Sequence, residues 1–332
     1  MNDSRKKVAL IYGGRGAEGR VSEMGAQMMR EYIDRSFDRF DILIKRDGRW
    51  LHEGKRTVFP TNLRGRGGFF LPEISEFVPV DCAFPLLHGD FGEDGVVQGA
   101  LDCADIPYLG CDGRVGAICR NKGVVKMIAE RLEIPTLPYI TARRGRDTVK
   151  RAENLIGYPM FVKPTTLGSS IGCSCVGNRS ELKEALKSAF ALCNEVIIEK
   201  LLTPKRELEC GYFATKGKQL FTNAGEIITN GEFYDYDKKY KCDKTQVIVR
   251  ADLPSGINKK IKEYSKRLIN HLGVRQISRI DFFLSGERIY FNEINTMPGM
   301  TVDSLYPKML EASGICPEKF IKMLVEDGVS VG

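Results

Sequence analysis

The first pattern along the chain is a short apolar run followed by glycines and an amphipathic stretch. Val8-Ala-Leu-Ile-Tyr12 ends at Gly13-Gly14, and after a loop the apolar positions from Ser22 to about Arg35 recur with the period of a helix. This order predicts a strand, a glycine turn and a helix. Apolar runs at 41–44, 78–84 and 106–109 follow, and they alternate with helical segments. The alternation favours a parallel α/β domain over residues 1–118.

Two further domains are expected after this one. Helical spacing recurs from 121 to 132 and again after Ser180, which we expect to cap a helix. Strand patterns at 159–163 and 172–176 lie between these helices, so a small α+β domain is predicted over residues 119–200. From 201 to 332 strands return, and a tight Ser285-Gly286 turn predicts a hairpin of 279–284 with 288–294.

Composition agrees with a globular protein of several domains. The 332 residues are 42% apolar and 28% charged, and this length exceeds what one hydrophobic core usually organises. The N-terminal residues 1–7 are polar, and the apolar run after them is shorter than a signal-peptide core or a membrane span. We therefore expect a cytoplasmic protein with no membrane association.

The reactive residue types narrow the chemistry. The ten cysteines include no C-x-x-C pair, and the three histidines are dispersed, so we expect neither a zinc site nor a nucleophilic triad. Catalysis must then rely on Asp, Glu, Lys and Arg. The net charge of +7 includes a basic cluster at 143–151, and no aromatic residues interleave with it. That favours a solvated helix face, or a rim suited to an anionic substrate, over a nucleic-acid groove.

One glycine motif points to a different class of enzyme. Gly14-Arg-Gly16-Ala-Glu-Gly19 fits the dinucleotide fingerprint, and Asp38 and Asp41 lie where a ribose-binding acid belongs. This interpretation predicts a nicotinamide-dependent oxidoreductase. Glu18 disfavours it, because a carboxylate inside the loop would repel a pyrophosphate.

Two other segments carry candidate nucleotide chemistry. Lys163 ends an apolar strand beside the loop 167–172, whose glycines leave backbone N–H groups available to phosphates; a surface lysine beside a turn is the alternative. The polar and aromatic segment Phe233 to Tyr240 has no sustained pattern. It is either a solvated loop or a lid that closes over a nucleotide.

The C-terminal hairpin predicts a metal site. Asp281 lies on one strand, while Glu293 and Asn295, two residues apart, project from one face of the next strand. Such oxygen ligands suit Mg²⁺ ions that bridge nucleotide phosphates. Arg279 shares the face of Asp281 and adds a cation where negative charge develops. The alternative is an exposed polar face of an edge hairpin.

Across nearly its whole length the chain resembles the D-alanine:D-alanine ligases, a family of the ATP-grasp superfamily. The resemblance rests on ordered blocks at Gly13-Gly14, Ala17-Glu18, Val21-Ser22, His88 to Gly95, Gln98-Gly99, Asn121-Lys122, Val162-Lys163-Pro164, Leu167 to Ser170, Ile198-Glu199-Lys200, Arg206-Glu207, Tyr234 to Tyr240, Arg279-Ile280-Asp281, Asn292 to Gly299 and Tyr306-Pro307. It implies an ATP-grasp fold with a parallel α/β N-terminal domain, a central lid-like domain and a C-terminal catalytic and metal-binding domain.

The resemblance also implies roles for individual residues. ATP would be bound by Lys122, Lys163, Ser170, Glu199, Lys200, Leu202, Glu207, Phe233 and Lys239. Two Mg²⁺ ions, or Mn²⁺, would be held by Asp281, Glu293 and Asn295. The two substrates would meet Glu18, His88, Ser304 and Leu305. The catalytic set would be Glu18, Ser169, Tyr240, Arg279 and Gly299. In that set, hydrogen bonds among the first three fasten the lid, and the last two stabilise an oxyanion.

The function implied is ATP-dependent ligation of two D-alanines through D-alanyl phosphate for peptidoglycan synthesis, by a homodimer. The rivals are a relative that joins D-alanine to D-serine or D-lactate, and a catalytically silent ATP-binding regulator. The silent regulator is disfavoured because the chain keeps Glu18, Lys163, Arg279, Asp281 and Glu293. D-lactate users of the family tend to lack the lid tyrosine, and specialists often carry a basic residue at the position of Leu305. Tyr240 and Leu305 therefore favour D-alanine as second substrate.

Overall fold

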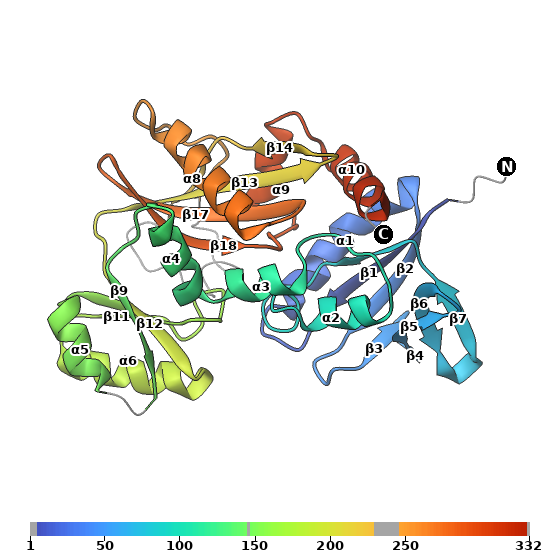
Figure 1. The fold of residues 1–332 in the computed structure, drawn as a ribbon, viewed down its shortest axis with the longest axis horizontal. Helices are drawn as coiled ribbons and strands as arrows, with labels where there is room; N and C mark the ends of the chain where they lie inside the picture. The colour runs from blue at the N-terminus through green and yellow to red at the C-terminus, as the bar shows by residue number, and fades with distance from the viewer. Residues whose placement is uncertain (1–4, 145–146, 229–245, 331–332) are drawn as a thin grey trace.

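The computed structural model describes residues 5–144, 147–228 and 246–330. Within these ranges the strands form sheets of five, four, six and three strands. Figure 1 shows the N-terminal sheet on one side of the molecule and the four-stranded sheet on the other, with the six-stranded sheet above both. No helix in the described ranges is long and apolar enough to cross a membrane.

The N-terminal sheet has the order β4-β3-β2-β1-β8. Its strands β1 (Lys7–Gly13), β2 (Asp38–Ile44) and β8 (Cys82–Pro85) are parallel, as predicted. The short β3 (Trp50–His52) and β4 (Arg56–Thr57) extend it antiparallel, so the complete sheet is mixed. Residues 8–11 are fully buried because both faces of β1 are covered. Helix α1 (Gly19–Ser36) packs on the face of Val8 and Leu10, and an apolar cluster that includes Val97 and Leu101 packs on the face of Ala9 and Ile11.

Two predicted strands of this domain differ from the structure. The run 78–84 is divided between β7 (Glu76–Pro79), which forms a separate sheet with β5 (Phe59–Leu63) and β6 (Arg66–Leu71), and β8. The extended run is interrupted at Asp81, whose carboxylate accepts a 2.6 Å hydrogen bond from the backbone N–H of Lys7. The run 106–109 makes only an isolated bridge to Ala83, since Pro107 has no N–H to continue a ladder.

Short helices connect the N-terminal sheet to the next one. They are α2 (Val96–Cys103), α3 (Gly113–Arg120) and α4 (Lys122–Arg131), whereas the 3-10 turn η1 (Pro72–Ile74) lies earlier, between β6 and β7. Asn121 ends α3 and caps α4, where its side chain accepts hydrogen bonds from two backbone N–H groups. The predicted boundary after residue 118 falls inside α3, and the division into three domains stays a prediction.

The middle of the chain forms an antiparallel sheet with two helices on one face, which agrees with the predicted α+β character. Its strands are β9 (Tyr139–Arg143), β10 (Met160–Pro164), β11 (Ser174–Val176) and β12 (Glu195–Lys200), and its helices are α5 (Thr148–Leu155) and α6 (Arg179–Leu192). The prediction that Ser180 caps α6 is wrong. Asn178 is the cap, and its side chain accepts a 3.1 Å hydrogen bond from the backbone of Glu181.

The third region is an antiparallel sheet that ends in the predicted hairpin. Its strands are β13 (Arg206–Thr215), β14 (Lys218–Phe221), β15 (Gly225–Ile228), β16 (Gln246–Ile248), β17 (Ile277–Ser285) and β18 (Arg288–Asn295). Helix α8 (Ile257–Leu272) lies between β16 and β17 in the chain. Gly286 supplies the left-handed conformation that the hairpin turn requires, with a φ of +56°.

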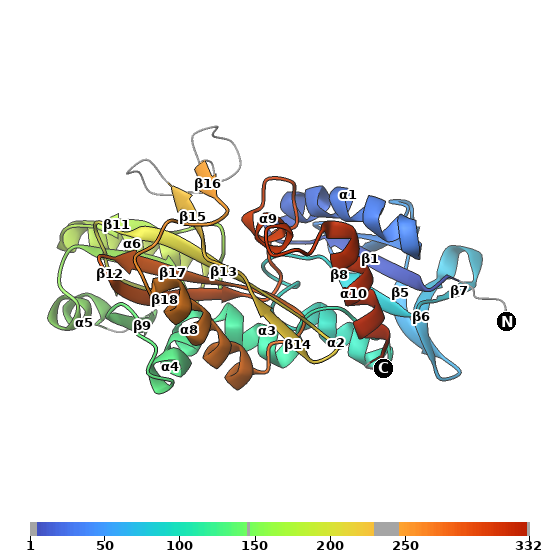
Figure 2. The ribbon, with the colours of Figure 1, turned by 90° about the horizontal axis from the view of Figure 1, so that it is seen from above.

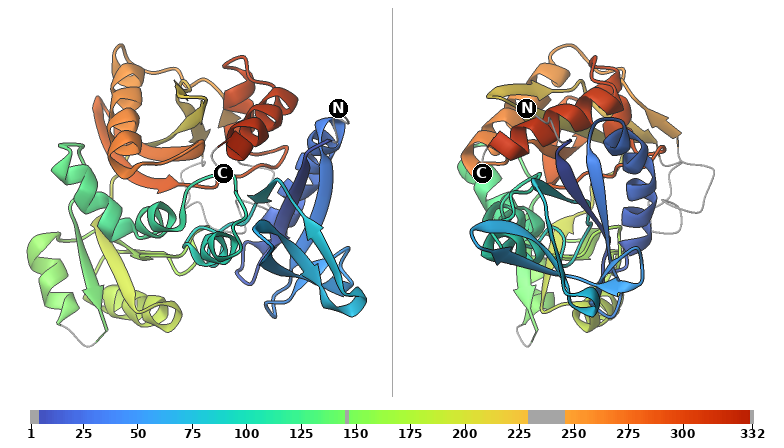
Figure 3. Two further views of the ribbon diagram at one scale, coloured as in Figure 1. Left: turned by 45° about the vertical axis from the view of Figure 1, so that its right-hand side comes forward. Right: turned by 90° about the vertical axis from the view of Figure 1, so that its right-hand side faces the viewer.

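The end of the chain returns to the N-terminal sheet. Helices α9 (Leu305–Glu311) and α10 (Pro317–Ser330) follow β18, and α10 packs against α1 and β8 (Figures 2 and 3). One apolar cluster accordingly contains Leu10, Met29 and Leu324. The first and last segments therefore share a core, and the segment between β18 and α9 is held against the N-terminal domain.

Candidate active site

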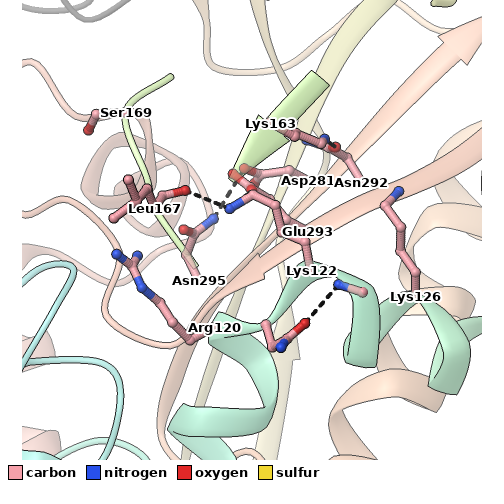
Figure 4. A network of polar contacts seen from close by, with 12 residues as sticks. Arg120, Lys122, Lys126, Lys163, Leu167, Ser169, Asp281, Asn292, Glu293 and Asn295 are labelled. Atoms are coloured by element: carbon pink, nitrogen blue, oxygen red, sulfur yellow. Dashed lines mark hydrogen bonds and ion pairs between the residues drawn. The ribbon is translucent and has the colours of Figure 1, made fainter. Parts of the chain in front are cut away.

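The hairpin β17–β18 carries the acidic centre of the site. Asp281 lies directly opposite Glu293, and Arg279 lies opposite Asn295. Residues two apart on a strand point to the same face, so all four side chains project together, as predicted. Figure 4 shows three of them, Asp281, Glu293 and Asn295. The neighbouring strand β13 adds Glu209, which lies opposite Asp281.

Arg279 is held by the carboxylates around it. Its Nε and Nη2 atoms lie 2.8 and 2.6 Å from the two carboxylate oxygens of Asp281, and Nε is 3.3 Å from Glu209. Burial lowers the pKa of Arg279, but the charges of Asp281 and Glu209 outweigh it and keep the pKa well above its ordinary value. Arg279 therefore carries a fixed positive charge in the cavity.

The oxygen donors of the hairpin fit magnesium. Asp281 and Glu293 are two carboxylates with part of their side chains exposed, at 13% and 24%, and Asn295 adds an amide that donates to Asp281 at 3.2 Å. In the described parts of the chain no group of three His, Cys, Asp or Glu side chains is arranged to hold a metal ion. Mg²⁺ needs only one or two protein carboxylates when water and substrate phosphates complete its shell, so this donor set suits it.

Two lysines face the hairpin from the middle region. Lys122, the first residue of α4, places its Nζ 3.3 Å from Glu293 and donates a 2.8 Å hydrogen bond to the carbonyl of Leu167. Lys163, at the end of β10, donates to the side chain of Asn292 at 3.1 Å. Figure 4 shows both lysines directed toward the strand that carries Glu293. That both lysines hold phosphates stays a prediction.

Glu199 lies behind Lys163 rather than in open space. Its two carboxylate oxygens lie 2.8 Å from Lys126 Nζ and 2.5 Å from Lys163 Nζ. Burial raises the pKa of Glu199, but the two ammonium groups dominate and lower the pKa to about 2. Burial lowers the pKa of Lys126, whereas the attraction of Glu199 overcomes burial at Lys163 and raises the pKa of that lysine.

The loop after β10 meets the first helix of the chain. Ser169 donates a 2.6 Å hydrogen bond to the Glu18 carboxylate, as predicted, although 151 positions separate the two residues. Ser169 and its neighbour Ser170 adopt left-handed backbone conformations, with φ of +51° and +58°. Gly89 has a φ of +72°, and a Cβ atom there would overlap the Glu18 carboxylate, so another residue would strain the backbone and displace that side chain.

A cavity of about 220 Å³ lies between these segments. The predicted residues that line it are Glu18, His88, Lys122, Ser169, Arg279, Glu293, Asn295, Gly299, Ser304 and Leu305. A second cavity, of about 140 Å³, adjoins it, and its lining includes Lys122, Lys163, Ser169, Ser170, Glu207, Arg279, Asp281 and Glu293. Seven residues line both cavities, and the charged ones among them, Lys122, Glu209, Arg279 and Glu293, therefore stand between the two.

Some predicted residues lie apart from these cavities. Lys200 donates to the backbone carbonyls of Gly157 and Tyr158, at 3.1 and 2.8 Å, and Leu202 is half-buried. Their contact with adenine stays a prediction, as does that of Glu199. Phe233, Lys239 and Tyr240 lie outside the described residues. A groove of about 1240 Å³ lined by α2, α3, β14 and α10 contains none of the predicted residues, so volume alone does not locate the site.

Sequence reasoning missed Arg120 and the acids around it. The side chain of Arg120 is 10% exposed, and its guanidinium lies 3.5 Å from Asp90, 3.6 Å from Glu93 and 4.0 Å from Glu18. Arg120 immediately precedes the Asn121-Lys122 block, and both acids belong to the block 88–95. The residue types were therefore visible, but the spacing along the chain does not show that they meet.

Glu93 has a second structural role that the sequence did not reveal. One of its carboxylate oxygens accepts a 2.9 Å hydrogen bond from the backbone of Gly89, and the other accepts one of 3.2 Å from the backbone of Met297. His88 Nδ1 also lies 3.1 Å from the Met297 carbonyl. Glu93 and His88 thus attach the segment after β18, at Met297, to the loop after β8.

Comparison with known protein families identifies two matching segments. A family described as D-ala D-ala ligase N-terminus matches residues 7–111, and one described as D-ala D-ala ligase C-terminus matches residues 128–326. The chain is 35% identical over 323 residues to a D-alanine–D-alanine ligase from Solibacter usitatus, which covers 96% of this chain and 94% of that protein.

Solved structures resemble the fold over nearly the whole chain. D-alanyl-alanine synthetase A from Vibrio cholerae superposes with a TM-score of 0.90 at 31% identity, covering 98% of this chain and 99% of that one. The VanG D-Ala:D-Ser ligase from Enterococcus faecalis gives 0.88 at 31%, covering 98% and 100%. A D-alanine–D-alanine ligase from Bacillus anthracis complexed with ATP gives 0.78 at 27%, covering 99% and 98%.

Proposed function

Because this chain belongs to the D-alanine–D-alanine ligase family, we propose that it joins two D-alanine molecules at the expense of ATP. The products are D-alanyl-D-alanine, ADP and phosphate, and the dipeptide serves peptidoglycan precursor synthesis. The observation that carries the proposal is that Arg279 and Glu293 line both adjoining cavities. A nucleotide phosphate on one side and an amino-acid carboxylate on the other would meet at these residues.

In the first step a carboxylate oxygen of D-alanine attacks the γ-phosphorus of ATP, and the bond from that phosphorus to the bridging oxygen of ADP breaks. Lys122 and Lys163 line the smaller cavity, where the ATP phosphates would lie. Their positive charges would stabilise the negative charge on the oxygens of the phosphoryl group during its transfer. Glu18 would receive the substrate ammonium, so that the substrate is held at both ends. L-alanine should be a poorer substrate, because only one configuration at the α-carbon fits when Glu18 holds the ammonium and Arg279 the carboxylate.

Asp281, Glu293 and Asn295 would hold two Mg²⁺ ions, and Mn²⁺ offers the same oxygen chemistry. When bound, these ions neutralise phosphate charge during the transfer. Arg279 contacts Asp281, and Lys122 contacts Glu293. These two basic side chains therefore lie beside the carboxylates, where the charge of the phosphates must be balanced.

In the second step the amine of the second D-alanine loses a proton and attacks the acyl carbon, and phosphate leaves. The oxyanion that forms would be stabilised by Arg279 and by the backbone N–H of Gly299, which both line the cavity. Water has to be excluded because it would hydrolyse the acyl phosphate. The Ser169–Glu18 hydrogen bond supports closure on the substrate side.

The second substrate is the finer point of the proposal, since one structural relative is a D-Ala:D-Ser ligase. Leu305 is 5% exposed and lines the cavity beside Ser304. An apolar side chain offers no hydrogen-bond donor to a serine hydroxyl and no charge to a hydroxy acid. This favours D-alanine at the second position.

The test is product analysis with ATP, Mg²⁺ and an equal mixture of D-alanine, D-serine and D-lactate. D-alanyl-D-alanine should be the main product by mass spectrometry at neutral pH. ADP release should need both D-alanine and a divalent ion, and EDTA should abolish it. Equal ADP release without an amino acid would contradict the ligase, whereas mainly D-Ala-D-Ser would change only the second substrate.

The proposal extends to the state of the enzyme in the cell. We expect a homodimer in the cytoplasm, where ATP and free D-alanine are available. Light scattering of the purified protein would measure the dimer, and fractionation of the source cells would test the location.

A further inference from the structure

Lys126 has no part in the reaction proposed above, yet its environment is unusual. It lies on α4, one helical turn after Lys122, and its side chain is fully buried. Its Nζ lies 2.8 Å from a Glu199 oxygen and donates a 3.1 Å hydrogen bond to the carbonyl of Phe291 on β18. Lysine is almost never fully buried unless it is paired, so this pairing has to be explained.

Glu199 is shared between two lysines. Its other oxygen lies 2.5 Å from Lys163, which lines the smaller cavity, whereas Lys126 and Glu199 do not line it. Lys163 and Glu199 are as deeply buried, with exposed fractions of 5% and 1%. The three side chains form one buried group with two positive charges and one negative charge.

The charge balance of this group depends on Lys126. A Lys163–Glu199 pair alone would be neutral, and the carboxylate would cancel most of the attraction of the ammonium for a phosphate. Lys126 pairs with the Glu199 oxygen that does not contact Lys163, and its positive charge balances the negative charge of Glu199. The excess positive charge of the group is therefore at Lys163, which lines the cavity. Charge interactions are strong here because little water screens them.

We infer that Lys126 is a positioning residue of the nucleotide site. It neutralises Glu199, so that Glu199 holds the Lys163 ammonium in place without cancelling its charge toward the nucleotide phosphates. The inference rests on the proposed ATP site. It assigns to Lys126 an effect on nucleotide binding that a purely structural residue between α4, β12 and β18 would not have.

The test removes the charge of Lys126 and then removes the charge that it compensates. Lys126→Met keeps the length of the side chain and leaves a neutral Lys163–Glu199 pair. Lys126→Met/Glu199→Gln deletes both charges and leaves Lys163 as the excess cation again. Lys187→Met, at an exposed position of α6, controls for the same substitution away from the site. Binding of a non-hydrolysable ATP analogue with Mg²⁺ is measured by calorimetry, together with the unfolding temperature.

We expect Lys126→Met to weaken binding of the analogue by about tenfold or more, because a close charge no longer compensates Glu199. Made in a Glu199→Gln protein, the same substitution should weaken binding by less than about threefold relative to Glu199→Gln alone, because no carboxylate is left to compensate, and Lys187→Met should bind normally. In steady-state assays the KM for ATP should rise for Lys126→Met while the KM for D-alanine stays unchanged. If Lys126→Met does not fold, Lys126→Gln takes its place, since its amide still reaches a carbonyl without carrying charge.

Two outcomes would overturn the inference: binding by Lys126→Met that equals the wild type, or a loss caused by Lys126→Met in the Glu199→Gln protein as large as its loss in the wild type. A wild-type protein that does not bind the analogue would instead contradict the proposed function. Wild-type binding is therefore measured first, and the two failures stay distinguishable.

Discussion

The two sides of the candidate site are built in different ways. On the hairpin, Asp281, Glu293 and Asn295 are placed by the pairing of β17 with β18, where a shift of one residue would turn them to the other face. On the opposite side, Glu18 and Ser169 lie on loops and meet through a side-chain hydrogen bond. In the proposed function, strands thus fix the groups that handle phosphate, while loops hold the amino acid.

The largest effect is expected on the strand side. Glu293→Gln removes one charge from the oxygens proposed to bind Mg²⁺ and from the contact with Lys122, but it preserves the size of the side chain. The loss of such a contact typically costs about 3 kcal/mol, so kcat should fall about a hundredfold. The KM for D-alanine should change little if the strand side serves phosphate transfer alone.

The matched control for Glu293→Gln lies on the same hairpin. Glu287→Gln makes the same change at the exposed turn between β17 and β18 and should leave turnover within about twofold of the wild type. Circular dichroism would establish that both variants are folded. Near-normal turnover of a folded Glu293→Gln would show that the hairpin is only structural.

A smaller effect of another kind is expected on the loop side. Ser169→Ala deletes the hydrogen bond to the Glu18 carboxylate, and a hydrogen bond to a charged group is worth about 1.5 kcal/mol, or roughly tenfold. The KM for D-alanine should rise by that factor, with a smaller change in kcat. Initial rates at saturating ATP measure both constants. A loss confined to kcat would remove the distinction between the two sides.

The smallest effect concerns the scaffold that carries the loop. Asn178→Ala removes the cap of α6 and should lower the free energy of unfolding by about 1 kcal/mol, without a change in the kinetic constants. Ser180→Ala, at the position that the sequence favoured as the cap, should stay within about 0.5 kcal/mol of the wild type. Urea unfolding of the three proteins measures this, and equal destabilisation by both variants would contradict the assignment of the cap.

The sequence predicted best where one element fixes several residues. The hairpin face at Arg279, Asp281, Glu293 and Asn295 follows from strand periodicity and one turn, and the structure contains it. The hydrogen bond between Glu18 and Ser169 was expected only from the family resemblance, because spacing along a chain says nothing about a contact between loops.

The remaining differences have identifiable physical causes. The run 78–84 looked like one strand because both halves are apolar, but Asp81 binds the backbone of Lys7 and divides it between two sheets. At α6, Asn178 and Ser180 both suit a cap, and only the backbone geometry distinguishes them. No sequence pattern singled out Lys126, because its partners Glu199 and Phe291 come from strands far along the chain.

Glu93 links the loop after β8 to the segment after β18, and this link bears on how specificity for the second substrate can change. Its carboxylate accepts hydrogen bonds from the backbone of Gly89 and of Met297, just before the segment that carries Gly299, Ser304 and Leu305. The segment proposed to surround the second substrate is therefore anchored to the loop after β8 independently of the Glu18–Ser169 contact. A substitution at Leu305 can then alter the pocket proposed for the second substrate while the backbone of that pocket stays in place. Single replacements could therefore change the preferred second substrate, for example from D-alanine to D-serine.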